Sequence, residues 1–457
     1  MGRKPMIVKN QALQLDCERL GADLEGVCFF EGQTVFVPGA LPGEHIEAKA
    51  VQVRPQYAFA RLTQVVRPSV DRCEPFCPAY ALCGGCSGQH MTYAATLTAK
   101  RAQVLDCLTR IGGLPLSPED VPPVWGAAEP LHCRNKTTLP VGGTVAQPLL
   151  GFYRRRSHDI VDIQDCPVAM GGVAEVLTAV RSWMTASGVE PYDERTGNGL
   201  LRHVIVRTNR AGDVLVLLVA TRESLPDVPV LVERLQRTVP GYCGLHVSEN
   251  RNRNNVILGE TSRRLHGADA IPETLLGLTF EISPLSFFQV NPAQTERLYQ
   301  AALDFAALTP QDVAVDAYAG AGTITLGLAR LCRRAIGLEI VPQAVESARR
   351  NAQHNGLTNV DFHCAAVEEQ LPALVAQGLR PEVIVLDPPR KGVEPSVIEA
   401  ILHAQPRRVV YVSCHVPTQA RDAALLAAGG YRFAGCQPVD LFCYAGGVEN
   451  VLCMERI

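Results

Sequence analysis

The chain has 457 residues, of which 47% are hydrophobic and 19% charged, and its formal net charge is −3. This length exceeds what one ordinary core organises, so we expect two or three domains. The near-neutral charge argues against a protein that binds every polyanion, and no apolar run reaches the roughly 18 residues that a membrane span needs.

The chain start, MGRKPMIVKN, is basic but has no apolar segment, so no signal peptide is expected. Sixteen cysteines without a secretion signal favour metal-binding or catalytic roles over a disulfide framework. We therefore expect a cytoplasmic protein without a membrane partner, and we expect it to be a monomer.

Residues 11–68 contain five strand-like segments separated by turn signals such as Gly21 and Gly43. The segments are LQLDCERL, VCFF, TVFVPG, HIEAKAVQV and YAFARLTQVV. Five short strands at this spacing predict a small β-barrel, which we assign to residues 1–70.

A group of cysteines follows the barrel segment directly, in CPAYALCGGC. Cys77, Cys83 and Cys86 form a Cys-x5-Cys-x2-Cys pattern. Four ligands are normally required for a structural zinc ion or an iron–sulfur cluster. The spacing leaves both groups open, with Cys73 as a candidate fourth ligand.

A helix is expected over residues 93–112, because five apolar residues share roughly one face: Leu97, Val104, Leu105, Leu108 and Ile111. Residues 113–280 then contain many strand-like segments and one clear helix, VAEVLTAVRSWMTASG. The segment VLVLLVA at 214–220 indicates a buried strand. We assign residues 71–280 to a mixed α+β central domain.

From residue 281 onward strands alternate with helices, which predicts a mostly parallel, doubly wound α/β sheet of the Rossmann-like kind over residues 281–457. Ligands on such sheets bind at the carboxyl ends of the strands. Chemistry-bearing residues at strand ends are therefore the candidates for a site.

The segment VDAYAGAGT places Gly320 and Gly322 after a strand, and Glu339 ends the next strand, where a carboxylate can bind both ribose hydroxyls. A dinucleotide site prefers a third glycine where this chain has Thr325. The segment therefore favours a nucleoside donor such as S-adenosylmethionine over NAD, with glycines that serve helix packing alone as the alternative. Asp387, in VIVLDPPR, closes a further strand at the same edge.

Cys414 ends the strand segment RRVVYVSC, and a helix follows whose dipole can lower a thiol pKa and favour the thiolate. Glu449 begins the last strand beside apolar residues, which predicts a raised carboxyl pKa and a role as a base. Position alone leaves an inert buried cysteine and a solvated glutamate as alternatives.

Motifs along nearly the whole chain resemble those of the bacterial RNA 5-methyluridine methyltransferases with an iron–sulfur cluster, which comprise the 23S rRNA uracil-5 methyltransferases and tRNA relatives. The motifs, in family order, are VFVPGALPGE, CPAYALCGGCSGQH, SFFQVNP, DAYAGAGT, DPPRKG and SC…TxARD. The resemblance implies an OB-like TRAM barrel at the N-terminus and an S-adenosylmethionine-dependent methyltransferase domain at the C-terminus.

The resemblance also implies roles for individual residues. Cys414 would add to carbon 6 of uracil, Glu449 would remove the proton from carbon 5, and Asp387 would orient the uracil or the donor. The implied S-adenosylmethionine contacts are Gln289, Tyr318, Glu339 and Asp387, beside the glycines Gly320 and Gly322.

The resemblance implies a 4Fe–4S cluster as a second cofactor. It matches the distant Cys166, in IVDIQDCPVA, to the fourth ligand and leaves Cys73 aside. The implied ligands are Cys77, Cys83, Cys86 and Cys166.

The implied partner is RNA. Ribosomal 23S RNA is favoured because the cluster-bearing bacterial relatives mostly act there, and tRNA is the alternative. Arg134, Lys136 and Arg154 are candidates for contacts with the RNA backbone, although an ordinary solvated basic face explains them as well.

Two segments depart from the family pattern: SCHVPT stands where SCNPxT is usual, and Gly447 replaces the histidine two positions before Glu449. Two rival functions follow from single features. The altered segment before Glu449 would suit an RNA-binding factor that has lost catalysis. The DPPR motif superficially resembles that of amino-group methyltransferases, which need no nucleophilic cysteine.

Overall fold

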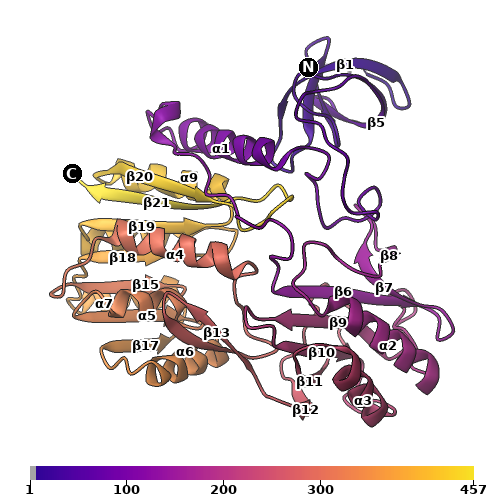
Figure 1. The fold of residues 1–457 in the computed structure, drawn as a ribbon. Helices are drawn as coiled ribbons and strands as arrows, with labels where there is room; N and C mark the ends of the chain where they lie inside the picture. The colour runs from indigo at the N-terminus through magenta and orange to yellow at the C-terminus, as the bar shows by residue number, and fades with distance from the viewer. Residues whose placement is uncertain (1–6) are drawn as a thin grey trace.

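The computed structural model describes residues 7–457, which form three bodies: a small barrel, a central sheet and a larger sheet covered by helices (Figure 1). The first six residues, on which part of the signal-peptide expectation depends, lie outside the described part. Among the described helices, none combines the length and the apolar character that crossing a bilayer requires.

The first five strands close into a barrel in the order β1-β2-β3-β5-β4, which confirms the predicted barrel. Burial alternates along the strands because successive side chains point to opposite faces, so that Leu13 and Leu15 lie inside. The strands are β1 (Ala12–Leu20), β2 (Gly26–Phe30), β3 (Gln33–Val37), β4 (His45–Val53) and β5 (Tyr57–Arg67).

Helix α1 (Tyr93–Arg110) follows the cysteine segment and begins at Thr92, whose side chain accepts a hydrogen bond from the Ala95 amide. Its buried residues Val104 and Leu108 pack against the third body, the larger sheet that contains the end of the chain, and not against the barrel. A short 3-10 turn, η1 (Pro118–Asp120), follows α1.

The central body is a seven-stranded sheet in the order β12-β11-β10-β9-β6-β7-β8, covered by two helices. Only the pair β10–β11 is parallel among its pairings, and β10 is buried at every residue. Its strands are β6 (Lys136–Gly143), β7 (Pro148–Tyr153), β8 (Ile160–Asp162), β9 (Leu201–Thr208), β10 (Val214–Ala220), β11 (Tyr242–Glu249) and β12 (Arg263–Gly267). Its helices are α2 (Val173–Ser187) and α3 (Val228–Thr238).

The third body is a seven-stranded sheet in the order β17-β16-β15-β18-β19-β21-β20. Its first five strands are parallel, and β21 is antiparallel to β19. Strands β15, β18 and most of β19 are buried on both faces, as continuous apolar runs in parallel sheets predict. The strands are β15 (Val313–Ala317), β16 (Arg334–Glu339), β17 (Val360–Cys364), β18 (Val383–Leu386), β19 (Arg408–Ser413), β20 (Tyr431–Val439) and β21 (Glu449–Arg456).

Helices cover both faces of this sheet, which confirms the predicted doubly wound α/β sheet. Helices α4 (Pro292–Ala306), α5 (Thr323–Ala329) and α6 (Pro342–His354) pack on one face. Helices α7 (Val367–Ala376), α8 (Pro395–Ala404) and α9 (Val416–Ala428) pack on the other, together with α1.

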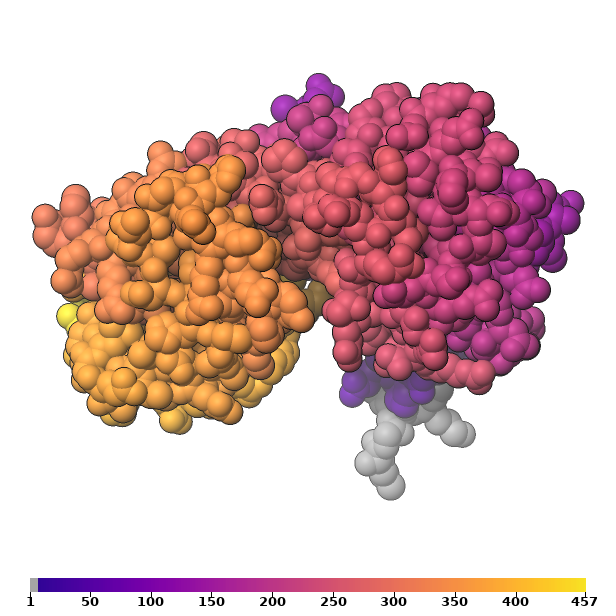
Figure 2. All heavy atoms as spheres, turned by 90° about the horizontal axis from the view of Figure 1, so that it is seen from below, coloured from indigo at the N-terminus to yellow at the C-terminus, as the bar shows by residue number. Residues whose placement is uncertain are grey.

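The hairpin of β13 (Ile271–Leu275) and β14 (Leu278–Ile282) packs into the core formed with α4, α5 and α6. The predicted domain boundary between residues 280 and 281 falls inside β14, in a hairpin that packs into the core of the third body. Seen from below, a hollow separates the third body from the central body (Figure 2).

Candidate active site

The carboxyl ends of four parallel strands meet at one edge of the third sheet, and the predicted site residues lie there. Tyr318, Glu339, Asp387 and Cys414 each stand at or directly after a strand end. Strand β21 runs from the middle of the molecule to its outer end (Figure 1), so its first residue, Glu449, reaches the same edge. The antiparallel last strand thus brings the candidate base to the candidate nucleophile.

The glycine turn after β15 is shaped by backbone conformation. Gly320 and Gly322 have φ of 54° and 83°, the left-handed region that glycine adopts without steric cost. The Gly320 amide donates to Oε2 of Glu339 at 2.9 Å, and the Val341 amide donates to Oε1 at 2.8 Å. These two bonds orient the Glu339 carboxylate at the turn.

Two carboxyl groups lie next to this turn, the buried Asp316 and the half-buried Asp387, whose amide donates to the Ala317 carbonyl. Burial, with a contribution from the charge of Asp387, raises the pKa of Asp316 to about 7, although Thr325 Oγ1 donates to its Oδ2 at 2.5 Å. Burial also raises the pKa of Asp387 to about 7. Thr325, which stands where a dinucleotide site would have a third glycine, therefore binds Asp316. Sequence reasoning did not identify Asp316 as part of the site.

Cys414 is half-buried, and burial raises the pKa of its thiol. The charge of Glu449 raises that pKa further, whereas a hydrogen bond from the Arg390 guanidinium lowers it. The thiol pKa of Cys414 is therefore raised, not lowered as the following helix predicted, because burial has the largest effect on it. Arg390, which sequence reasoning also missed, is the cation that opposes this effect.

Glu449 is 2% exposed, and burial raises its pKa well above 4.5, as predicted. The charge of Asp387 raises it further, and Arg390 lowers it. Its Oε2 atom is buried without a hydrogen-bond partner among the described residues. A carboxyl group in this setting favours its neutral form and becomes a strong base once it has lost its proton.

Tyr299 of α4 faces the same carboxyl groups. Its hydroxyl accepts a hydrogen bond from Thr323 Oγ1 at 3.3 Å, and burial, Asp387 and Glu449 raise its pKa. No strand end or glycine turn marks this tyrosine in the sequence. It joins the site only because α4 covers the sheet next to β19 and β21.

The SFFQVNP segment connects this edge to the central body. Gln289 is buried, and its backbone carbonyl accepts from Asn135 Nδ2 at 2.9 Å. The Arg207 guanidinium donates to the Pro284 and Ser286 carbonyls. Phe287, between these anchors, is 75% exposed.

The three candidate RNA contacts differ in their surroundings. Lys136 lies beside Arg207 across the β6–β9 pair, and burial, with a contribution from Arg207, lowers its pKa to about 8. Arg134 lies near the Cys86 thiol and lowers its pKa. Arg154 is exposed and forms a backbone bridge with Cys83.

The four predicted cluster cysteines lie near one another, since the charge of one thiol raises the pKa of the next. Burial raises the pKa of Cys166 to about 11, and Cys86 and Cys77 raise it further, while Cys83 and Cys77 raise that of Cys86. No cysteine contributes to the shift of Cys73, which is exposed. Within residues 7–457, no group of three or more His, Cys, Asp or Glu side chains is arranged to hold a metal ion.

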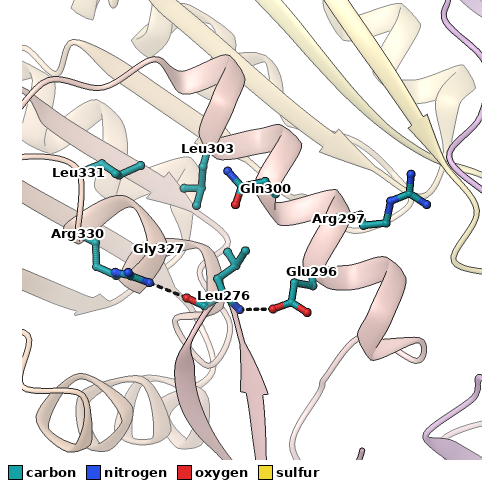
Figure 3. A pocket seen from close by; sticks show the side chains of 8 residues that line it. All are labelled: Leu276, Glu296, Arg297, Gln300, Leu303, Gly327, Arg330 and Leu331. Carbon is teal, nitrogen blue, oxygen red and sulfur yellow. Dashed lines mark hydrogen bonds between the residues drawn. The ribbon is translucent and has the colours of Figure 1, made fainter.

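A surface groove of about 590 Å³ lies away from these residues, between α4, α5 and the β13–β14 turn (Figure 3). The Leu276 amide donates to Glu296 Oε1 at 2.8 Å, and Arg330 donates to the Leu276 carbonyl at 2.6 Å. These bonds tie the hairpin turn to α4 and α5. None of the residues that line the groove belongs to the strand-end site, so we assign the chemistry to the strand ends.

Comparisons with known proteins agree with this architecture. The family model described as tRNA (Uracil-5-)-methyltransferase matches residues 277–457, and the TRAM domain model matches residues 13–63. An uncharacterized RNA methyltransferase of Clostridium acetobutylicum is 38% identical over 452 residues, which cover 99% of this chain and 98% of that protein. One of Halalkalibacterium halodurans is 41% identical over 448 residues, covering 98% and 97%.

A solved structure shares the whole arrangement. The tRNA (uracil-54, C5)-methyltransferase of Pyrococcus abyssi, in complex with S-adenosyl-L-homocysteine, is 25% identical and has a TM-score of 0.77. The match covers 97% of this chain and 100% of that one. Taken with the family matches, this shows that the chain belongs to the RNA (uracil-5-)-methyltransferase family and is an S-adenosylmethionine-dependent RNA methyltransferase with an N-terminal TRAM domain.

Proposed function

We propose that this enzyme methylates carbon 5 of a uridine in 23S ribosomal RNA, through a covalent adduct between Cys414 and carbon 6 of the uracil. One observation carries the proposal: Glu449 and Asp387 lie close enough to Cys414 to raise its thiol pKa, and Arg390 lies beside Cys414 and Glu449 at the same sheet edge. A thiol and a buried carboxyl group are the nucleophile and the base that this reaction needs.

Addition of the Cys414 thiolate to carbon 6 turns carbon 5 into an enolate-like nucleophile, which uracil alone does not provide. The Cys414 thiol must first lose its proton to solvent, because burial raises its pKa, and the Arg390 guanidinium stabilises the resulting thiolate. S-adenosylmethionine, when bound, supplies the methyl group that carbon 5 takes up.

Glu449 then removes the proton from carbon 5. The electrons of that carbon–hydrogen bond re-form the double bond between carbons 5 and 6, and the bond from carbon 6 to sulfur breaks. Cys414 leaves as a thiolate, and the methylated base is free. Glu449 retains the proton until solvent or a buffer removes it.

The donor would bind over the glycine turn. Glu339, oriented by two backbone amides, retains oxygen lone pairs for ribose hydroxyls. Gly320 and Gly322 let the backbone approach the ligand, and Tyr318, Gln289 and Asp387 complete the proposed set.

The proposed 4Fe–4S cluster would be bound by Cys77, Cys83, Cys86 and Cys166, whose thiols lie near one another. Zinc requires four ligands about 2.0–2.3 Å from one centre, whereas a cubane cluster places its four thiolates on separate iron atoms and needs them farther apart. The effects of these thiols on one another's pKa support a common site, and the family resemblance selects the cluster over zinc. The Gly85 amide, 3.3 Å from Cys83 Sγ, is a donor of the kind that tunes such sulfurs.

The RNA class rests on the resemblance to cluster-bearing bacterial enzymes, which mostly act on ribosomal RNA. The target base would be turned out of its stack into the site, as sequence-specific RNA enzymes require. Lys136, Arg134 and Arg154 would contact the backbone. The likeness to a tRNA (uracil-54, C5)-methyltransferase favours tRNA as the second candidate substrate.

Tritium release from 5-labelled uridine tests the reaction, and mapping of 5-methyluridine in rRNA and tRNA from a deletion strain tests the substrate. Cys414→Ala should lower release by about 10³-fold or more, while calorimetry shows unchanged S-adenosylmethionine binding. Near-normal release by this variant would contradict the nucleophile assignment.

In the deletion strain, loss of 5-methyluridine from tRNA instead of 23S rRNA would select the second substrate.

A further inference from the structure

The orientation of Glu449 depends on the loop of residues 440–448, which connects β20 to β21. No side chain among the described residues hydrogen-bonds its buried Oε2 atom, and Gly447 has no side chain that could do so. The backbone pairing of Val439 with Glu449 closes the loop. The position of the carboxyl group therefore depends on the pairing of β21 with β19 and β20 and on how the backbone of the loop is held.

Helix α1 holds the start of this loop. Lys100 and Asp440 form an ion pair at 2.5 Å, and both side chains are 0% exposed. Lys100 also donates to the Phe442 carbonyl at 2.9 Å, and the Tyr93 hydroxyl donates to Asp440 Oδ2 at 2.7 Å. Because α1 precedes the loop by more than 300 residues, this contact joins distant parts of the chain.

The segment directly after Cys86 holds the middle of the loop. The amides of Ser87 and Gly88 both donate to the Tyr444 carbonyl at 2.9 Å, and the Phe76 ring lies 4.9 Å from the Tyr444 ring. Tyr444 has φ of 58°, a left-handed conformation that is costly for a residue with a side chain. Such a conformation persists where its surroundings determine it, and here the two amides and the ring contact do so.

We propose that Tyr93 and Lys100, with the Ser87 and Gly88 amides, are positioning residues for Glu449. They hold loop 440–448 so that the carboxylate reaches the proton on carbon 5. This inference rests on the proposed function.

The effect should be specific to the elimination step, because Cys414 has different supports. Asp422 accepts hydrogen bonds from the Tyr411 hydroxyl at 2.8 Å and the Val393 amide at 3.0 Å, which ties β19 and the DPPRKG segment to α9. None of these bonds involves loop 440–448. Loosening the loop should thus leave addition and methyl transfer intact and slow the removal of the carbon 5 proton.

The test compares Lys100→Met and Tyr93→Phe with Arg101→Met as a matched control. Arg101 lies on the same helix but donates to the Val121 and Pro118 carbonyls, away from the loop. Each variant is incubated with S-adenosylmethionine and in vitro transcribed 23S rRNA. The protein–RNA adduct that survives denaturing electrophoresis and the rate of tritium release are both measured.

Lys100→Met and Tyr93→Phe should accumulate adduct and release tritium at least about tenfold more slowly, with unchanged donor binding, while Arg101→Met behaves as wild type. If Lys100→Met does not fold, Tyr93→Phe, which removes only a hydroxyl, decides the question. Wild-type release by Tyr93→Phe, or equal loss of adduct and release, would overturn the inference. Glu449→Gln separates the two proposals, since a failure of that variant to trap adduct would contradict the base assignment itself.

Discussion

Glu449 is a single side chain whose burial links stability to pH. Burial raises its pKa above the ordinary 4.5. The stability that this group contributes is therefore fully present below its unfolded pKa and is lost as the pH rises through its folded pKa. Glutamine has no charge to bury, so Glu449→Gln should melt near the wild-type temperature at pH 4 and above it at pH 8.

Thermal unfolding at the two pH values, followed by circular dichroism, measures this difference. Glu455 is a matched control on the same strand, because hydrogen bonds from Arg432 and Arg408 lower its pKa instead. Glu455→Gln should therefore not gain stability at pH 8. A Glu449→Gln variant that gains none either would show that the carboxyl group is not held in its neutral form.

Lys136 gives the proposed RNA contact a pH dependence. Its pKa is lowered to about 8, chiefly by burial, so it loses its charge as the pH rises from 7 to 9. RNA affinity should fall over this interval in the wild type and remain steady in Lys136→Arg, since arginine stays charged.

Salt titration supplies an independent measurement for Lys136. A cation that contacts single-stranded RNA phosphate releases a counterion, so Lys136→Met should reduce the slope of log affinity against log salt by about 0.7. An unchanged slope would place Lys136 outside the RNA-binding surface.

At the scale of elements, strands β3 and β5 present three aromatic rings on the outside of the barrel. The Phe36 ring lies 5.3 Å from Phe59 and 5.9 Å from Tyr57, and the Arg156 guanidinium lies 4.7 Å above Phe59. Arg61 follows in the same outward register of β5. Aromatic rings beside cations are what unpaired bases stack on in OB-like barrels.

Tyr57→Ala should therefore weaken binding of single-stranded RNA by about 1–3 kcal/mol and leave binding of a perfect duplex unchanged. Phe29, on β2 of the same barrel, is 39% exposed against 38% for Tyr57 and is the matched control. Equal losses for Tyr57→Ala and Phe29→Ala, measured by fluorescence anisotropy, would assign the effect to the barrel as a whole.

Residue patterns within single elements predicted much of the fold. Alternating burial in the barrel strands and the apolar runs of β10, β15 and β18 follow from periodicity. Of the five residues predicted to form the apolar stripe of α1, only Val104 and Leu108 are buried, and Ile111 is 50% exposed. The element that α1 packs against could not be inferred, because an amphipathic stripe predicts that one face of a helix is buried but not which element covers it. Its contact with loop 440–448 depends on Lys100, a charged residue that the stripe does not include.

At the scale of the whole molecule, the site could be located because parallel strands deliver their carboxyl ends to one edge. That rule placed Glu339, Asp387 and Cys414. It did not place Arg390 or Tyr299, which reach the edge from a loop and a covering helix. The direction of the Cys414 pKa shift could not be predicted from the sequence either, because the helix-dipole argument did not include the burial that dominates this pKa.

The cysteine segment lies where the three bodies meet. Replacing a proposed cluster ligand should therefore affect more than metal content. Cys166→Ser should yield protein without iron and without broad absorption near the visible–ultraviolet boundary, whereas Cys73→Ser should keep both after anaerobic purification. Ser87 and Gly88 follow Cys86 directly and hold the Tyr444 carbonyl. If the proposed cluster is bound, its loss should therefore also increase hydrogen exchange in loop 440–448 of Cys166→Ser, although Cys166 lies in the central body. Iron retained by Cys166→Ser, or lost from Cys73→Ser, would reassign the fourth ligand, and unchanged exchange would separate the cysteine segment from the position of Glu449.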